Sequence, residues 1–221
     1  MALTTLIFDL DGTLIDSAPD LRTACNKVLA TKGRREITLQ ETTQFVGNGA
    51  AKLVERAFRT TGDAVSEDEI PALTEAFLAF YDGHEADETT IYEGVEQTLQ
   101  KLKDQGYRMG LCTNKPYIPT INLMKDLGLG DFFEVMIGGD QVATKKPHPE
   151  MIHKALADMG VDVADAIMIG DSPNDIGAAK NAGLRNVAVS YGYRKVPVEA
   201  LEADVVIDQM SDLPRAINSL T

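Results

Sequence analysis

The stretch TTLIFDLDGTLIDSAPD, residues 4–20, places two acidic side chains directly after an apolar run. Residues 6–8 are all apolar, which is the pattern of a buried strand, and Asp9 and Asp11 follow them. Burying an unpaired charge costs several kcal/mol, so a strand that ends in acids needs partners for them. We therefore expect a bound cation among these acids.

The composition indicates an ordinary globular protein and argues against some classes of partner. The 221 residues suit one large domain or a domain with an insertion, and the chain is 44% hydrophobic and 25% charged. Its formal net charge of −13 would repel nucleic acid and anionic membranes, so we expect neither as a partner. A small anionic substrate stays compatible with this charge, because a bound cation can reverse the potential inside one pocket.

Cysteine usage and the N-terminus favour a cytoplasmic location. Cys25 and Cys112 are far apart and lack metal-ligand spacing, so we expect two reduced, buried thiols. No apolar run approaches the ~18 residues of a membrane span. The N-terminus has neither a basic region nor a small-residue cleavage site, so no secretion signal is apparent. The sequence leaves the choice between a monomer and a homodimer open.

Short apolar segments alternate with helical patterns along most of the chain. Six segments have the pattern of strands: residues 3–10, 107–114, 133–139, 165–171, 185–191 and 204–208. Val95, Leu99 and Leu102 between two of them share one helix face. Nearly continuous apolar strands separated by helices predict an α/β, Rossmann-like fold with a parallel sheet covered on both faces.

The region after the first strand breaks this alternation. Leu21, Ala24, Val28 and similar positions recur at helical spacing, and no strand pattern is convincing between residues 17 and 85. We predict a four-helix insertion, with residues 17–86 as a helical cap domain and residues 1–16 and 87–221 as the core. Such an insertion leaves the sheet at the carboxyl end of a strand, where open α/β sheets bind ligands, so it is a candidate lid.

Polar side chains follow the four best-defined strands. They are Asp9, Asp11, Thr113, Asn114, Lys145, Lys146, Asp171 and Asp175. Parallel strands end at the same edge of a sheet, so these groups should converge in one crevice. Mg²⁺ prefers a few carboxylate or carbonyl oxygens and keeps positions for phosphate and water. The arrangement predicts a magnesium-dependent enzyme that acts on a phosphate ester.

Each group then has a role in phosphoryl transfer. The carboxylates of Asp9 and Asp171 and the backbone carbonyl of Asp11 would hold Mg²⁺. Asp9 would attack phosphorus and form an acyl phosphate, and Asp11 would protonate the leaving oxygen and later deprotonate water. Thr113 and Lys146 would hold the other phosphoryl oxygens.

Neighbouring residues would support that chemistry. Gly12 lets the backbone N–H groups of its turn approach the phosphate closely, and we assign Gly12 and Asn114 to substrate binding. Asp175 would cap the helix that begins after Ser172 and also act on the metal ligands from behind. Lys145 reads as a surface charge.

Other readings of these residues are weaker. The segment 9–20 has the length of an EF-hand loop, but its glycine stands at position 4 instead of 6 and a strand precedes it. Asp16 and Asp20 have the spacing of residues that serve the start of the first cap helix, together with Ser17. His84, His148, and His153 show no ligand spacing, so we expect them to be structural or exposed.

Four short segments, in this order, resemble the motifs of the haloacid dehalogenase-like hydrolase superfamily. They are FDLDGT (8–13), CTN (112–114), KKPHPE (145–150) and GDSPND (170–175). The resemblance covers the whole chain and implies a Rossmann-like core, a helical cap after the first strand, Mg²⁺ and an aspartyl-phosphate intermediate. It makes Asp9 the nucleophile, Asp11 the general acid and base, Thr113 and Lys146 phosphate ligands, and Asp171 a metal ligand.

Within the superfamily, several stretches are similar to the bacterial phosphoglycolate phosphatase family. This implies hydrolysis of a small phosphomonoester, 2-phosphoglycolate, to glycolate and phosphate. The turn VGNG (46–49) would seat the substrate carboxylate at a helix start, with help from Asn48 and Arg56, although Arg56 and Lys52 fit a solvent face equally well. The alternatives are a related phosphatase for a sugar phosphate, nucleotide or pyrophosphate, and a scaffold without turnover.

Overall fold

A six-stranded parallel sheet forms the centre of the molecule. The structure is a computed structural model that describes residues 3–193 and 195–220. The strands lie in the order β5-β4-β1-β6-β7-β8, and every pair is parallel. Their bounds are β1 Thr5–Phe8, β4 Arg108–Cys112, β5 Val135–Ile137, β6 Ala166–Gly170, β7 Arg185–Val189 and β8 Val205–Ile207. The predicted α/β fold and all six predicted strands are confirmed.

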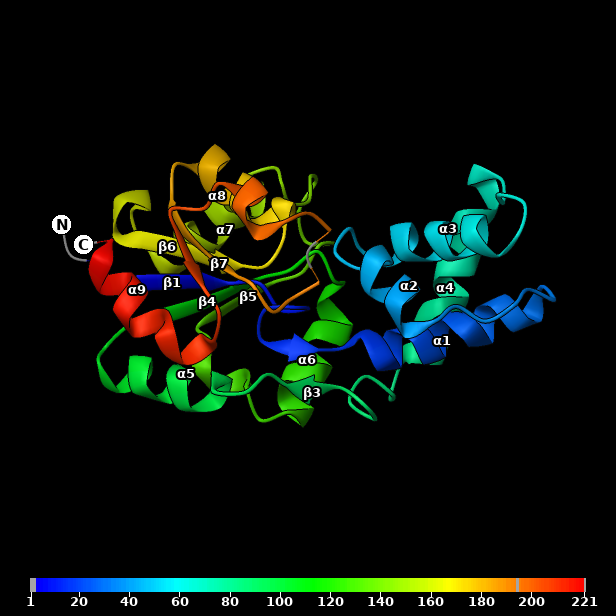
Figure 1. Ribbon diagram of the computed structural model, residues 1–221, viewed down its shortest axis with the longest axis horizontal. Coiled ribbons are helices and arrows are strands. Elements are labelled where there is room, and N and C mark those ends of the chain that lie inside the picture. The colour runs from blue at the N-terminus through cyan, green and yellow to red at the C-terminus, as the bar shows by residue number, and fades with distance from the viewer. Residues whose placement is uncertain (1–2, 194, 221) are drawn as a thin grey trace.

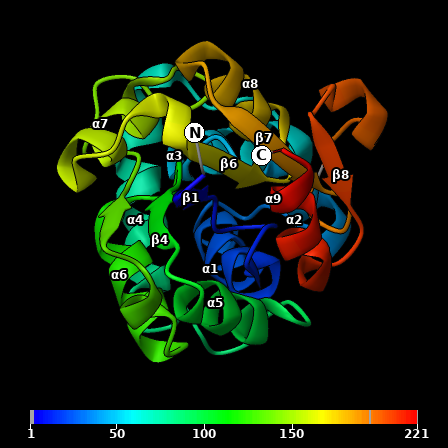
Figure 2. The ribbon, with the colours of Figure 1, turned by 90° about the vertical axis from the view of Figure 1, so that its left-hand side faces the viewer.

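Helices cover both faces of this sheet (Figures 1 and 2). Helices α7 (Glu150–Met159) and α8 (Pro173–Ala182) lie on one face. Helices α5 (Val95–Asp104), α6 (Tyr117–Asp126) and α9 (Leu213–Ser219) lie on the other. Short 3-10 turns connect several elements: η2 Gly130–Phe132, η3 Val163–Asp165, η4 Val198–Leu201 and η5 Met210–Asp212.

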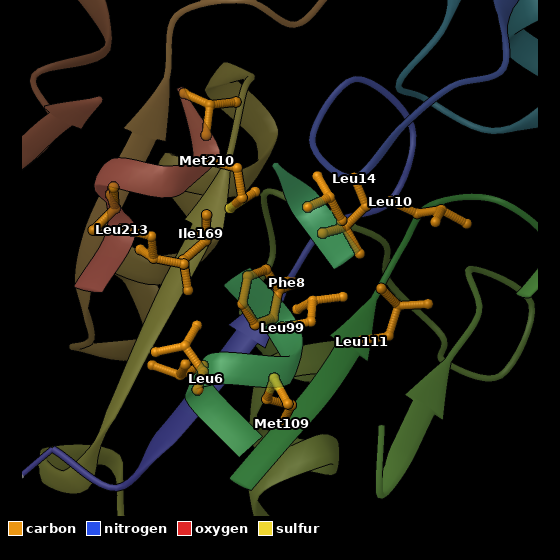
Figure 3. Close-up of a cluster of buried hydrophobic side chains, with 14 of the residues drawn as sticks. Leu6, Phe8, Leu10, Leu14, Leu99, Met109, Leu111, Ile169, Met210 and Leu213 are labelled. Carbon is orange, nitrogen blue, oxygen red and sulfur yellow. The ribbon is translucent and has the colours of Figure 1, made fainter. Parts of the chain in front are cut away.

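Side chains of the central strand alternate between the two layers of core. Leu6 and Phe8 pack against the helices of the α5 side, whereas Ile7 packs against the α7 side. Figure 3 shows Leu6 and Phe8 among Leu99, Met109 and other side chains of the larger cluster. All three β1 residues are fully buried, because the strand lies in the middle of a sheet with two covered faces.

The insertion after the first strand consists of helices packed on one another. These are α1 Ala18–Thr31, α2 Leu39–Phe45, α3 Ala50–Thr61 and α4 Ile70–Tyr81, with the short turn η1 Glu67–Glu69 before α4. Their apolar faces form a separate cluster that includes Val28, Phe58 and Phe77. In Figure 1 these helices stand at the right, at the end of the sheet opposite the termini.

A small antiparallel ribbon, which the sequence analysis missed, joins the two regions. Strand β2 (Ile15–Asp16) enters the helical region and strand β3 (Thr90–Ile91) returns from it, and Asp16 pairs with Thr90. Two residues per strand are too few to show a period in the sequence. The ribbon brings the outgoing and returning chains together beside the end of β1.

Asp20 has a different role from the predicted one. We expected it to serve the start of α1, but Ser17 at that position makes no side-chain cap bond. The Asp20 carboxylate instead accepts hydrogen bonds from the backbone N–H groups of Glu88 and Thr89 and from the Thr89 hydroxyl, at 2.7–3.0 Å. Asp16 fits the prediction better, because it accepts from the Ala18 N–H at 3.3 Å.

Candidate active site

The register of the central strands brings the predicted polar residues to one edge of the sheet. Phe8 is paired with Leu111 on one side and with Ile169 on the other. Asp9 follows the first of these residues directly, and Thr113 and Asp171 come two positions after the other two. The three side chains are buried at the carboxyl ends of β1, β4 and β6, as the sequence predicted.

Lys146 holds two of the acids at the floor of the site. Its ammonium donates to Asp9 Oδ1 at 2.7 Å, to Asp175 Oδ1 at 2.6 Å and to the Cys112 carbonyl at 2.6 Å. Three donors meet three acceptors, so the ammonium is fully hydrogen-bonded. Burial lowers the pKa of Lys146, but the two carboxylates outweigh this and hold that pKa above its usual value.

Three buried carboxylates lie close together at this floor. One oxygen from each of Asp9, Asp171 and Asp175 falls within 4.8 Å of the others. Burial, and then repulsion from Asp175, raises the pKa of Asp9 to about 7, although Lys146 opposes the rise. Burial and the charges of Asp175 and Asp9 likewise raise the pKa of Asp171 well above its ordinary value. One lysine does not neutralise three acids, so a cation fits here.

Two glycines make room for the Asp171 carboxylate. A Cβ added to Gly12 would stand 2.5 Å from Asp171 Oδ2, and one added to Gly192 would stand 2.5 Å from the same oxygen. Gly12 also has a φ of +91°, which side chains rarely adopt. Asp171 Oδ2 accepts the backbone N–H of Tyr193 at 2.6 Å. The chain thus packs tightly around one oxygen-rich position, as a small hard cation requires.

Asp175 is engaged through both oxygens. Oδ1 accepts from Lys146, and Oδ2 accepts the Ser172 backbone N–H at 3.0 Å and the Ser172 hydroxyl at 2.6 Å. Ser172 and Asp175 form a capping box at the start of α8, which confirms the predicted cap. Both oxygens of Asp175 are bonded within the protein. This carboxylate therefore orients Lys146 from a position behind Asp9 and Asp171.

Asp11 lies on the side of the site that faces the cap. Its Oδ1 accepts the Ser17 hydroxyl at 2.5 Å and the Lys115 ammonium at 3.4 Å. Thr113 lies beside it, and its hydroxyl oxygen accepts the Lys115 backbone N–H at 3.2 Å. That contact uses a lone pair of the Thr113 hydroxyl, so its proton can be donated to a ligand.

Asn114 connects the core to the cap loop. Its amide donates to the carbonyls of Gly47 at 2.9 Å and Lys146 at 3.1 Å and accepts the Lys146 N–H at 3.0 Å. Asn174 also donates to the Gly47 carbonyl, at 2.9 Å. The structure therefore gives Asn114 a positioning role, and its predicted contact with substrate stays a prediction.

Asn48 and Arg56 are bonded mainly to each other and to the cap loop. The Arg56 guanidinium donates to the Phe45 carbonyl and to Asn48 Oδ1, both at 2.7 Å. Asn48 reaches the core through Asn174 Oδ1 at 3.5 Å. Both residues line a cavity beside Asp171, so the predicted role in substrate binding is compatible with their place and stays a prediction. Lys52 is exposed and pairs with Glu55.

Lys145 is not the simple surface charge that we expected. It is half-buried, and its ammonium would stand 2.7 Å from a Cβ placed on Gly49. The approach is possible because Gly49, at φ +85°, has no side chain. Lys145 thus packs against the turn of the cap loop, a contact that sequence spacing cannot reveal.

A pocket lies between the strand ends and the cap helices. Its lining includes Asp9, Asp11 and Lys146 from the core and Leu53, Phe77 and Tyr81 from the cap. The Tyr81 hydroxyl is buried and makes no hydrogen bond within the described part of the chain. An unpaired buried hydroxyl costs about 1–3 kcal/mol, so this group calls for an explanation.

The sequence analysis missed several residues that shape the site. Lys115 stands two residues after Thr113, but a lysine at a loop start has no distinguishing signal. Tyr81 ends the apolar stripe of α4, and that spacing by itself predicts a core side chain. Tyr193 binds Asp171 through its N–H and Asp16 and Ala18 through its hydroxyl. These contacts join segments far apart in the chain, which periodicity does not report.

The remaining sequence predictions concern features away from the site. Cys25 and Cys112 are free and buried, as expected. His84, His148 and His153 are exposed. None of the helices among the described residues has the length and apolarity that a bilayer span requires.

Comparisons with known proteins agree with this geometry. The sequence pattern of the haloacid dehalogenase-like hydrolase family matches residues 6–189. A phosphoglycolate phosphatase from Caulobacter vibrioides is 41% identical over 216 residues, which cover 98% of this chain and 91% of that protein. One from Agrobacterium fabrum is 39% identical over 211 residues, which cover 96% of this chain and 91% of that protein.

A solved structure extends the likeness to nearly the whole fold. The crystal structure of a predicted phosphoglycolate phosphatase from Haemophilus somnus 129pt superposes with a TM-score of 0.91 at 30% identity and covers 97% of each chain. The likeness in sequence runs through all four motif segments, and the likeness in structure runs through nearly the whole chain. The protein therefore belongs to the haloacid dehalogenase-like hydrolase family.

Proposed function

We propose that this hydrolase cleaves 2-phosphoglycolate to glycolate and phosphate through a phosphoryl group carried on Asp9. The protein is a phosphatase, a phosphoric monoester hydrolase. The observation that carries the proposal is the placement of Asp9 at the pocket floor, bonded to Lys146 and within 4.8 Å of two further acids. The related proteins named above as phosphoglycolate phosphatases support the choice of substrate.

The first step joins phosphorus to the side chain of Asp9. Lys146 bonds Oδ1, so we assign the attack to Oδ2. An Asp9–phosphorus bond forms, the ester P–O bond breaks, and Asp11 donates a proton to the leaving oxygen. Asp11 is placed for this transfer because it lines the same pocket as Asp9, and the contacts from Ser17 and Lys115 both go to its Oδ1, so we assign the transfer to Oδ2.

The second step releases phosphate. Asp11, now ionised, takes a proton from water as the water oxygen attacks phosphorus and the Asp9–phosphorus bond breaks. The Thr113 hydroxyl holds a phosphoryl oxygen during both steps. Lys146 was predicted to do the same, but its three donors bond the protein, so it supplies positive charge beside the phosphoryl group instead. The cap helices over the pocket limit the entry of bulk water, so we propose residues 17–86 as a cap domain on a core of residues 1–16 and 87–221.

Mg²⁺ is the proposed cofactor, held by the carboxylates of Asp9 and Asp171 and the backbone carbonyl of Asp11. When bound, Mg²⁺ supplies positive charge that lets an anionic carboxylate meet an anionic phosphoryl group. The dense carboxylate cluster and the glycine cradle of Asp171 support a small, hard, oxygen-binding cation. Two buried free thiols support the reducing cytoplasm as its location.

A substrate panel tests the proposal most directly. We expect magnesium-dependent hydrolysis, with kcat/KM higher for 2-phosphoglycolate than for sugar phosphates, nucleotides, pyrophosphate or an aryl phosphate. A higher kcat/KM for one of the other phosphate compounds would make that compound the substrate and leave the two-step chemistry unchanged. Beryllium fluoride with Mg²⁺ should form an adduct on Asp9, visible in a crystal structure, and an adduct elsewhere would reject the nucleophile.

A further inference from the structure

The pocket wall between Asp11 and helix α4 carries two polar groups that the mechanism above does not use. We call this pair, Lys115 and Tyr81, the cap-side pair. Lys115 comes from the loop after β4 and Tyr81 is the last residue of α4. Both side chains line the same pocket as the nucleophile Asp9.

The Tyr81 hydroxyl lies beside the Lys115 ammonium but makes no regular hydrogen bond with a described residue. The residue is 1% exposed, and its hydroxyl makes no hydrogen bond within the described residues. Its ring stacks on Phe77, with centroids 5.8 Å apart and planes 13° from parallel, so packing fixes where the hydroxyl lies. Burial raises the pKa of Tyr81 to about 12, against the opposing effect of the nearby Lys115, so the hydroxyl keeps its proton.

Lys115 is a buried cation with spare bonding capacity. Its ammonium is 3.4 Å from Asp11 Oδ1, a long contact, and stands 4.7 Å from the centroid of the Tyr81 ring. An ammonium has three donors, and with only 4% of the side chain exposed, water has little access to the other two. The Lys115 carbonyl accepts the Gly139 N–H at 2.8 Å, so its backbone is anchored.

The other cations that the structure describes in the cleft are already bonded or open to water; Lys145, for example, is only half-buried. Lys146 has three partners at the pocket floor. Arg56 donates two of its five N–H groups, to the Phe45 carbonyl and to Asn48, and is half-buried, so water can bond the others. Lys195 donates to the Val46 carbonyl at 2.7 Å and is exposed, so water can complete its shell. Among the described residues of the cleft, the cap-side pair therefore offers an anionic group of a ligand donors that are buried and unused.

We propose that the Lys115 ammonium and the Tyr81 hydroxyl bind the carboxylate of the substrate and so select phosphorylated small acids. This inference rests on the proposed function. In 2-phosphoglycolate one methylene separates the ester oxygen from the carboxylate. Asp11 protonates that oxygen and Lys115 adjoins Asp11, so the carboxylate reaches the cap-side pair when the phosphate is at Asp9. Apolar neighbours such as Leu53 and Phe77 strengthen the charge interaction by excluding water.

Tyr81→Phe is the decisive variant because it removes one oxygen and keeps the ring. We expect the ratio of kcat/KM for 2-phosphoglycolate to kcat/KM for p-nitrophenyl phosphate to fall about tenfold, since the aryl ester has no carboxylate. Lys115→Met should lower the same ratio by about 100-fold, the size of a lost charge-assisted bond in a buried site. An unchanged ratio in both variants would overturn the subsite.

Lys154→Met is the matched control. It makes the same substitution at an exposed lysine of α7, which pairs with Asp158 at 3.0 Å on the protein surface. The control should leave the ratio at the wild-type value. A fall in the control equal to that of Lys115→Met would show that loss of charge anywhere lowers the ratio, and would overturn the assignment to the cap-side pair.

Glycolate binding separates this proposal from the proposed function. Calorimetric titration of the magnesium-loaded wild-type protein with glycolate should show binding, with none for the neutral glycolamide. Tyr81→Phe should weaken glycolate binding about tenfold. Wild-type protein that hydrolyses neither ester would reject the proposed function, and the titration would still decide the subsite. Equal affinity in wild type and both variants, or no glycolate binding, would overturn it.

Discussion

Two buried lysines face the same pocket, and the chain treats them in opposite ways. Lys146 donates three hydrogen bonds of 2.6–2.7 Å, two of them to carboxylates. Lys115 has one long contact of 3.4 Å with Asp11 and an aromatic neighbour, Tyr81, whose hydroxyl makes no hydrogen bond with a residue that the structure describes. The side chains of both lysines are at most 4% exposed, so the contrast does not come from access to solvent.

The difference separates preorganisation from recognition. A fully bonded ammonium keeps its position before and during the reaction, which suits a group that holds a nucleophile in place. An incompletely bonded ammonium lowers the stability of the free protein. A ligand that supplies the missing acceptors restores that stability. The floor of the pocket therefore serves the chemistry common to the family, and the cap-side pair serves the choice of substrate.

The largest expected effect comes from Asp9→Asn, which removes the attacking oxygen at the floor. We expect turnover to fall by roughly 10³–10⁵-fold, as for the loss of other catalytic groups. Lys146 keeps Asp175 and the Cys112 carbonyl, so the fold should survive. Steady-state kinetics measures the loss, and circular dichroism checks the fold. A folded variant with a turnover rate near that of wild type would contradict the assignment of Asp9 as the nucleophile.

Lys146→Met and Lys115→Met compare the two lysines by stability. Removing Lys146 strands Asp9 and Asp175, and breaking a buried pair costs about 3–5 kcal/mol. Removing Lys115 strands only Asp11, which keeps the Ser17 hydroxyl, so we expect a smaller loss of about 1–3 kcal/mol. Urea unfolding of both variants without metal measures the difference. Equal losses of stability would contradict the contrast between Lys146 at the pocket floor and Lys115 of the cap-side pair.

The floor should also make the metal-free protein sensitive to pH. The pKa of Asp9 rises from 3.8 to about 7 on folding, so between these values the folded state holds a proton that the unfolded state has lost. This contribution to stability is complete below pH 3.8 and disappears as the pH rises through 7. The slope is at most ~1.4 kcal/mol per pH unit.

The Asp9→Asn variant isolates that contribution. The free energy of unfolding of wild type minus that of the variant, measured in chelator, should decrease as the pH rises from 4 to 7 (about the interval between the two pKa values). Mg²⁺ competes with the proton, so adding it should stabilise wild type more at high pH than at low pH. A difference that stays flat with pH would mean that Asp9 does not titrate in this range.

The smallest expected effect is that of Tyr81→Phe on the stability of the free protein. The Tyr81 hydroxyl has no partner among the described residues, so its removal should leave the melting temperature unchanged or raise it slightly, by up to ~1 kcal/mol in free energy. Thermal unfolding without ligand measures this. A clear loss of stability would show that the hydroxyl is hydrogen-bonded inside the free protein. The cap-side pair would then be as fully bonded as Lys146 at the pocket floor.

How far the sequence predicted the molecule depends on the range over which each signal acts. The six strands follow from short apolar runs, and the position of Asp9 follows from its place one residue after such a run. Parallel strands share an edge, so Thr113 and Asp171 could also be assigned before any coordinates existed. The capping role of Asp175 was equally predictable, because a capping box lies within four consecutive residues.

The wrong predictions concern residues whose partners in the structure are distant in sequence. Asp20 was assigned to its own helix start, but it bonds Glu88 and Thr89, which are distant in sequence. Lys145 was assigned to the surface, but it packs on Gly49 of the cap. In each case a local pattern supplied a plausible partner, and a partner from another part of the chain occupies that place in the structure.

The sequence by itself determined the α/β core, the helical insertion and the acids at the strand ends, because periodicity and strand order are properties of adjacent residues. The tertiary structure alone decided that Lys115 meets Tyr81 across the pocket and that the Tyr81 hydroxyl has no hydrogen-bond partner among the described residues. Those facts depend on how the cap packs on the core, and packing brings together residues whose spacing in the chain carries no period.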